Sequence, residues 1–164
     1  MKLRMKQDWV SIGDDFTITD QDGNEVVTVD GKVFSIGDKL TLHDPSGREL
    51  ARISEKLISI GPAYEVIRGG KVAAVVKKDL FTLFRCSFTV DVPGPDDLEA
   101  EGSLTEHEYE FRRGGRTVAK VSKSWFSFRD SYGIEVAPGE DTILILASAV
   151  VIDLCCHRDR EGHE

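Results

Sequence analysis

The sequence has 164 residues, of which 40% are hydrophobic and 30% charged, with a formal net charge of −8 at pH 7 and an isoelectric point near 5.0. This length and mixture fit one globular domain and exclude extended disorder, while the negative charge disfavours nucleic acid as a partner. We expect a single domain over residues 1–164, with strands from about 9 to 136, a helix from about 140 to 157 and a polar tail at 158–164.

The first half of the chain consists of short β-prone runs separated by glycine turns. Runs such as Phe16–Thr19 and Lys39–His43 each have the length of about one strand. Turn pairs such as Asp22-Gly23 and Gly69-Gly70 supply the positive φ angles that tight hairpins need. The pattern predicts an antiparallel meander.

A weak internal repeat supports this interpretation. Leu50–Lys56, Val72–Lys77 and Val118–Lys123 share an apolar-Ala-x-apolar pattern and end in lysine, each after a glycine turn. Repeated hairpins suit a closed barrel or a sandwich, and the spacing alone does not choose between them. Pro93–Asp97 marks a break that we interpret as a loop between the two halves.

The strand pattern stops at Pro138-Gly139, and the segment Glu140–Arg158 has the character of a helix. Acidic residues begin it and His157 and Arg158 lie near its end, as the helix dipole favours. From residue 143 to 152 only Ser148 is polar, so this helix would be apolar around its whole circumference and must be surrounded. The apolar run is about half of the roughly 20 residues that cross a bilayer, so we expect protein and not lipid around it.

A barrel of suitable size could enclose such a helix. Twelve strands about 4.8 Å apart and tilted by about 40° give a backbone radius of about 12 Å. An α-helix with its side chains is about 10 to 12 Å wide, which leaves room for one layer of strand side chains.

Several segments, in this order and at this spacing, resemble the LURP-one-related family of prokaryotes and plants. They are Trp9–Phe16, Gly47–Lys56, Asp97–Gly102, His107–Glu110, Val118–Val136 and the apolar helix. The resemblance implies a mainly β (α+β) fold: a closed antiparallel barrel of about twelve strands that encloses a hydrophobic C-terminal helix. Tubby C-terminal domains share this architecture, and phospholipid scramblases share it more distantly.

The charges are unevenly distributed along the second half. Residues 91–110 contain eight acids and no lysine or arginine, whereas residues 112–129 contain six bases and no acid. Because tubby domains resemble phosphoinositide-binding modules, the resemblance implies an anionic ligand or phospholipid headgroup as a candidate partner. The candidate ligand-binding residues are Lys77, Arg113, Lys120, Lys123 and Arg129. The simpler alternative is that Glu106, Glu108 and Glu110 pair with Lys120 and neighbouring bases across strands.

Lys77 and Lys123 have an additional feature. Under strict alternation Lys77 shares a face with Ala73 and Val75, and Lys123 shares one with Ala119 and Val121. We expect these faces to point inward, which would place each lysine at a rim of the barrel. There it could bind an anion or extend to solvent.

Motifs for catalysis and for cofactors are missing from the sequence. It has no nucleophile elbow, P-loop, dinucleotide fingerprint or His-Glu-x-x-His pattern, and we predict neither a cofactor nor a metal site. Cys155 and Cys156 lack a second pair at zinc spacing and are interpreted as buried helix residues, with palmitoylation as an alternative. If the protein were an enzyme, Asp96, Asp97 or His107 at a barrel rim would be the candidates.

We therefore interpret the chain as a non-catalytic binding or scaffold domain with an anionic lipid or a protein as its partner. An enzyme of unknown class and a membrane-associated, scramblase-like protein are the alternatives. Neither the ligand nor the oligomeric state follows from the sequence.

Overall fold

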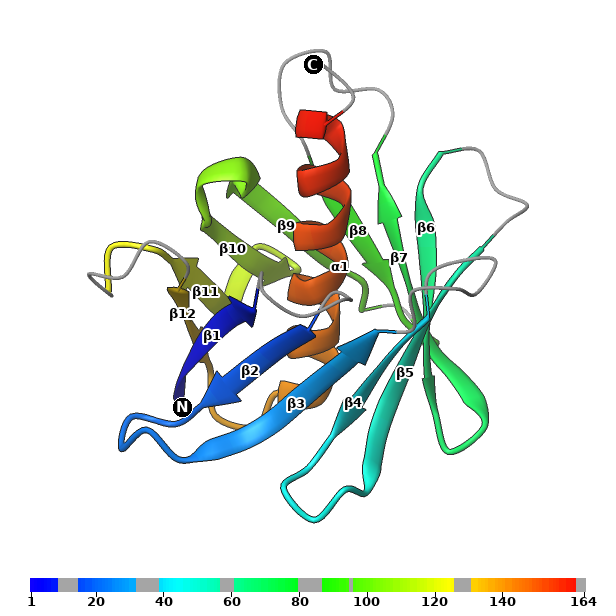
Figure 1. Ribbon diagram of the computed structural model, residues 1–164. Helices are drawn as coiled ribbons and strands as arrows, with labels where there is room; N and C mark the ends of the chain where they lie inside the picture. Colours follow the sequence, from blue (N-terminus) through cyan, green and yellow to red (C-terminus); the bar gives the residue numbers. More distant parts are fainter. Residues whose placement is uncertain are drawn as a thin grey trace.

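Figure 1 shows the computed structural model, in which a ring of strands surrounds one helix. The structure describes residues 1–8, 15–31, 39–56, 61–79, 87–94, 96–125 and 131–161. The strands in this part of the chain are β1 (Lys2–Asp8), β2 (Asp15–Thr19), β3 (Glu25–Gly31), β4 (Lys39–His43), β5 (Glu49–Glu55), β6 (Ala63–Arg68), β7 (Lys71–Lys78), β8 (Phe88–Asp91), β9 (Leu98–Ser103), β10 (Glu108–Arg113), β11 (Arg116–Ser122) and β12 (Ser131–Val136). A 3₁₀ turn, η1 (Leu104–Glu106), lies between β9 and β10, and the helix is α1 (Thr142–Glu161).

Each strand pairs antiparallel with the next, and β1 closes the ring against β12. The described residues therefore form a closed barrel of twelve strands, as predicted. At the closure Leu3 lies opposite Ile134, and the backbone amide of Val136 donates to the carbonyl of Met1 at 2.8 Å.

The strands begin earlier than expected, because Lys2–Asp8 forms β1, whereas the prediction placed the first strand near residue 9. Leu3 and Met5 are buried, and the residues between and beside them, Lys2, Arg4 and Lys6, alternate with them on the outer face. This period of two is the ordinary signature of a strand with one face in the core. The predicted start, Trp9, lies outside the described residues.

The helix begins at Thr142 and ends at Glu161, instead of spanning about 140 to 157. Asp141 precedes its first turn and accepts a hydrogen bond from the Leu144 amide at 3.2 Å, so this acid acts as the N-terminal cap. The last residues of α1 occupy the first part of the segment that we expected to be a polar tail.

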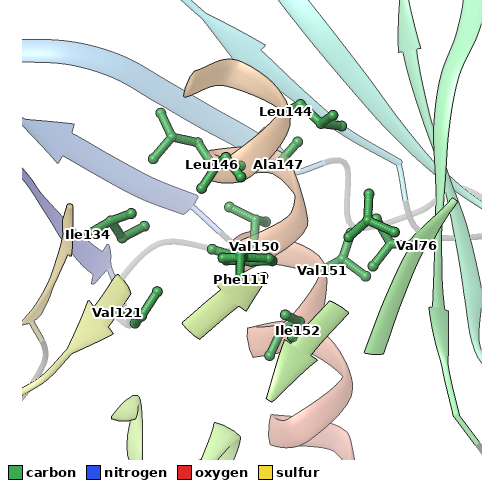
Figure 2. Close-up of a cluster of buried hydrophobic side chains, with 14 of the residues drawn as sticks. Val76, Phe111, Val121, Ile134, Leu144, Leu146, Ala147, Val150, Val151 and Ile152 are labelled. Atoms are coloured by element: carbon green, nitrogen blue, oxygen red, sulfur yellow. The ribbon is translucent and has the colours of Figure 1, made fainter. Parts of the chain in front are cut away.

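The helix fills the interior of the barrel. Leu146, Ala147, Val150 and Val151 have no exposed surface, and Leu144 is only 6% exposed. Figure 2 shows strand side chains, among them Val76, Phe111, Val121 and Ile134, gathered around the labelled residues of the helix. The single polar residue of the apolar run, Ser148, donates its hydroxyl to the Leu144 carbonyl at 2.8 Å, so its polarity is satisfied within the helix.

Charged groups tie the helix to the barrel at its first turn and again at Asp153 in its later half. Near the first turn, Arg113 Nη1 lies 2.6 Å from Glu140 Oε2, and Arg68 Nη1 lies 2.5 Å from Asp141 Oδ2. Three turns further along, Asp153 faces the opposite end of the barrel. In the part of the chain described here, no helix is long and apolar enough to cross a membrane.

Close approach of two strands depends on Gly102 in β9. Its φ is +132°, and a Cβ atom at this position would lie 2.6 Å from the Glu108 carbonyl oxygen and 2.8 Å from the Tyr109 Cα. Because no side chain fits there, only glycine lets β10 approach β9 this closely, in the position where Tyr109 reaches the core.

The helix core should respond strongly to lost volume. We expect Leu146→Ala to lower the free energy of unfolding by about 2–5 kcal/mol, because a fully enclosed site cannot collapse around the cavity. Val72→Ala, at a side chain that is 47% exposed on the outside of β7, should change it by less than about 0.5 kcal/mol. Urea unfolding measures both, and equal effects would contradict enclosure of the helix.

Candidate functional site

The predicted ligand residues do not converge on one site. Lys77 lies on the outer face of β7 and its ammonium pairs with Asp91 at 3.2 Å. The buried residues of β7 are Ala74 and Val76, so the prediction that Ala73 and Val75 point inward with Lys77 was wrong. Both faces of β7 carry small apolar residues, so the alternation along this strand does not show which face points inward.

The prediction for Lys123 was correct in part. Ala119 and Val121 of β11 are buried, and Lys123 is exposed just beyond the end of this strand, at a rim of the barrel. Its backbone amide donates to the carbonyl of His107 at 3.0 Å and to Glu108 Oε1 at 2.9 Å.

The other predicted cations have structural partners or acidic neighbours. The Arg113 guanidinium is shared between Glu140 and the Asp96 carbonyl. Lys120 is exposed on β11 and lies directly opposite Glu110 on β10 and Glu135 on β12, as the cross-strand alternative expected. Arg129 lies outside the described residues.

A groove on the outer surface brings together cations that the sequence analysis did not single out. It has a volume of about 370 Å³ and is lined by Lys2, Leu3, Arg4, Asp20, Gln21, Gly23 and Trp125. Lys2 and Arg4 point outward from β1 because Leu3 and Met5 occupy its inner face. The Lys2 ammonium lies 5.1 Å from the centroid of the Trp125 ring, which is the geometry of a cation–π contact.

The acid in this groove is occupied by its own turn. Asp20 Oδ1 accepts the backbone amides of Asp22 and Asn24, each at 2.9 Å, and Oδ2 accepts the Asn24 side chain at 3.1 Å. These hydrogen bonds, that of the Asn24 side chain foremost, lower the pKa of Asp20. The carboxylate is thus held within the β2–β3 turn while the two cations line the groove. Of these, Lys2 lies directly opposite Glu135 on β12, as Lys120 does, and differs from Lys120 in its contact with Trp125.

A second polar cluster lies between the barrel and the later turns of the helix. Asp153 of α1 receives His107 Nε2 on Oδ1 at 2.5 Å and the Tyr132 hydroxyl on Oδ2 at 2.8 Å. The His107 and Tyr132 rings stack with centroids 4.3 Å apart. His107 has a φ of +55° at the end of η1, a left-handed conformation that turns the chain into β10.

Tyr109 borders this cluster but does not complete it. Its ring packs edge-on against Phe111, and its buried hydroxyl has no hydrogen-bond partner among the described residues. Burial and the Asp153 charge raise the pKa values of the Tyr109 and Tyr132 phenols well above their usual range.

The remaining candidates are two acids in a loop and two cysteines of the helix. Asp96 and Asp97 are exposed in a loop, where Asp97 accepts the Val92 amide at 3.1 Å. Cys155 and Cys156 are buried residues of α1 that form no disulfide with a described residue, and their burial was predicted. Within the described ranges, no three His, Cys, Asp or Glu residues are grouped as metal ligands.

Comparison with known proteins places this barrel in a family. The profile of LURP-one-related proteins matches residues 1–153. The uncharacterised protein YxjI of Bacillus subtilis (strain 168) is 35% identical over 161 residues, which cover 98% of this chain and 97% of YxjI. The chain belongs to the LURP-one-related family.

The same fold occurs in a plant protein of known structure. The X-ray structure of a protein from Arabidopsis thaliana matches the LURP-one-related chain with a TM-score of 0.70 and 23% identity, covering 94% of this chain and 91% of the plant protein. At this identity the likeness establishes the barrel with its helix, and the family resemblance inferred from sequence is confirmed. The family is one of uncharacterised proteins, so the chemistry has to be argued from the residues.

Two tyrosines of this LURP-one-related chain offer a matched test of the polar cluster. Tyr132→Phe should lower the free energy of unfolding by about 1–3 kcal/mol, because Asp153 loses a donor inside the barrel. Tyr109→Phe should be neutral or stabilising by up to about 1 kcal/mol, because it removes an unpartnered buried hydroxyl. Chemical denaturation of the two variants checks this, and a large loss for Tyr109→Phe would show that its hydroxyl is satisfied.

The same phenols should make the fold sensitive to alkali. Their pKa values are raised in the folded state, so above pH of about 10 only the unfolded chain releases these protons, and stability falls as pH rises. Each phenol contributes a slope of about 1.4 kcal/mol per pH unit in this window. The Tyr109→Phe/Tyr132→Phe double variant should lose stability less steeply than the natural chain when melts are recorded from pH 9 to 11.

Proposed function

We propose that this LURP-one-related chain is a non-catalytic, cytoplasmic binding domain that holds an anionic group in the groove between β1, the β2–β3 turn and Trp125. The observation that carries the proposal is the placement of Lys2 and Arg4 side by side on one face of β1, next to an aromatic ring and within a groove. The ligand chemistry is a phosphate or carboxylate, whether on a free molecule or on a phospholipid headgroup.

The filled interior supports a site on the outside. Side chains of the helix and the strands occupy the axis of the barrel, where Ile145, Leu146 and Ile152 are at most 1% exposed. A ligand of metabolite size needs a cleft of about 300 Å³ or more, and the groove at Lys2 reaches this size.

The electrostatics of the groove also support an anion. The net charge of the chain is −8, so a local pair of cations has to attract the ligand against a repulsive background. Binding should therefore be short-ranged and should weaken as salt rises. Arginine and lysine together suit a phosphate, because the guanidinium offers two parallel donors and the ammonium a point charge.

A titration with two probes tests this function. Inositol hexakisphosphate followed by NMR or calorimetry represents a free anion, and phosphatidylcholine vesicles containing about one tenth phosphatidylinositol bisphosphate represent a headgroup. We expect binding of at least one probe, weakened about tenfold by Lys2→Gln/Arg4→Gln, which corresponds to about 1.4 kcal/mol.

Lys77→Gln is the matched control, because it removes a positive charge from the outside of β7, where Lys77 pairs with Asp91. It should leave binding unchanged within about twofold. Equal weakening by both variants would show a nonspecific charge effect, and absence of binding to either probe would remove the proposal.

A further inference from the structure

His107 is held in one tautomer by its neighbours. An aspartate only accepts hydrogen bonds when ionised, so the ring nitrogen that lies 2.5 Å from Asp153 Oδ1, Nε2, must carry the hydrogen. In the neutral imidazole the lone pair is then on Nδ1. The structure shows no hydrogen-bond partner for Nδ1 among the described residues.

The aspartate is itself fixed. Its side chain is 11% exposed, and Tyr132 approaches its second oxygen. The Tyr132 hydroxyl also lies 2.6 Å from Met5 Sδ, but its one proton favours the carboxylate, because hydrogen bonds to a charged acceptor are the stronger. Tyr132 positions Asp153, and Asp153 positions the imidazole, while the His107 side chain remains 23% exposed.

His107 lies near one exposed cation and between two carboxylates that are bonded to other groups. Lys123 is exposed at the same rim, and its backbone is bonded to that of His107. The acids on either side in the sequence have their own partners. Glu106 accepts the Ser103 hydroxyl at 3.2 Å, and Glu108 accepts the Ser122 hydroxyl and the Lys123 and Ser124 amides. Slight burial acts to raise the pKa of Glu108, but the hydrogen bonds, led by that of Ser122, outweigh it and lower the pKa.

We propose that His107 is a phosphoryl acceptor, modified on Nδ1 by a small phosphoryl donor at this rim of the barrel. The Nδ1 lone pair forms a bond to phosphorus, and the bond from phosphorus to the leaving group breaks with its electron pair on that group. The Nε2 hydrogen stays in place, and Asp153 faces the positive charge that develops on the ring. No proton has to leave the imidazole.

The chain contains its own control in His43. This imidazole has a similar exposure of 29%, but it faces Asp30 through the other ring nitrogen, Nδ1, at 3.3 Å, and Asp30 is 60% exposed. This contact is an ion-pair distance without a hydrogen bond, so it does not fix the tautomer of His43, and Asp30 is not held inside the barrel. The two histidines should differ in both the rate and the position of phosphorylation.

Phosphoramidate is a suitable probe, because ammonia leaves as the nitrogen–phosphorus bond of the reagent breaks and the new one to the imidazole forms. The folded chain is incubated with it at pH 8, peptide mapping assigns the modified histidine, and ³¹P NMR distinguishes the Nδ1 and Nε2 isomers. We expect the Nδ1 isomer at His107, no fixed preference for one isomer at His43, and faster labelling of His107.

Asp153→Asn should slow labelling of His107 by about tenfold or more and should leave His43 unchanged, because only the orienting carboxylate of His107 is lost. Circular dichroism confirms that this variant is folded. If it does not fold, the isomer formed in the natural chain still decides the question. The Nε2 isomer at His107, labelling no faster than at His43, an unchanged rate in a folded Asp153→Asn variant, or no labelling would each overturn the proposal.

Discussion

The structure depends on the burial of a helix that is apolar on every side. Helix α1 has no polar stripe to present to water, so each side chain from Leu144 to Ile152 needs protein around it. A closed antiparallel sheet meets this requirement, because every strand contributes one apolar face and no strand edge is left open. The helix occupies the axis, which would otherwise be an apolar cavity, and the interior therefore offers no room for a ligand.

Polar groups are placed at the two ends of this buried axis. Glu140 and Asp141 face arginines at one end, and Asp153 faces His107 and Tyr132 at the other. Carboxylates at these positions are costly unless they are paired, and each has partners on more than one strand or element. The contacts of Asp153 that help to fix the helix therefore also order the imidazole of His107, which is the proposed phosphoryl acceptor.

The fold was predictable because its strongest signal is local. The uniform apolarity from residue 143 to 152 excludes a surface helix, its length excludes a bilayer span, and the glycine turns indicate the hairpins. The start of β1 was also readable, since Lys2, Leu3, Arg4, Met5 and Lys6 alternate, but the prediction began at residue 9. The inner face of β7 was not readable, because Ala73 and Val75 are as apolar as Ala74 and Val76.

The sites required the three-dimensional structure. Lys2 and Trp125, and likewise His107 and Asp153, are far apart in the sequence and meet only through the barrel and its helix. Most of the predicted cations were chosen from a run of charge along the chain, whereas the folded structure decides whether a cation has a partner. Lys77 pairs with Asp91 of the adjacent strand, and Arg113 pairs with Glu140 just before the helix.

The pairing of β1 with β12 also governs the order in which the chain can mature during translation. Among the strands of the barrel, β1 is synthesised before its two neighbours. Its partner on one side, β2, follows at once, whereas β12 and then α1 follow only after all the other strands. Until α1 has emerged, Leu3, Met5 and the inner faces of the other strands have no helix to pack against. Until closure the barrel strands therefore expose hydrophobic surface, a state in which chains with long-range strand pairing are prone to aggregate.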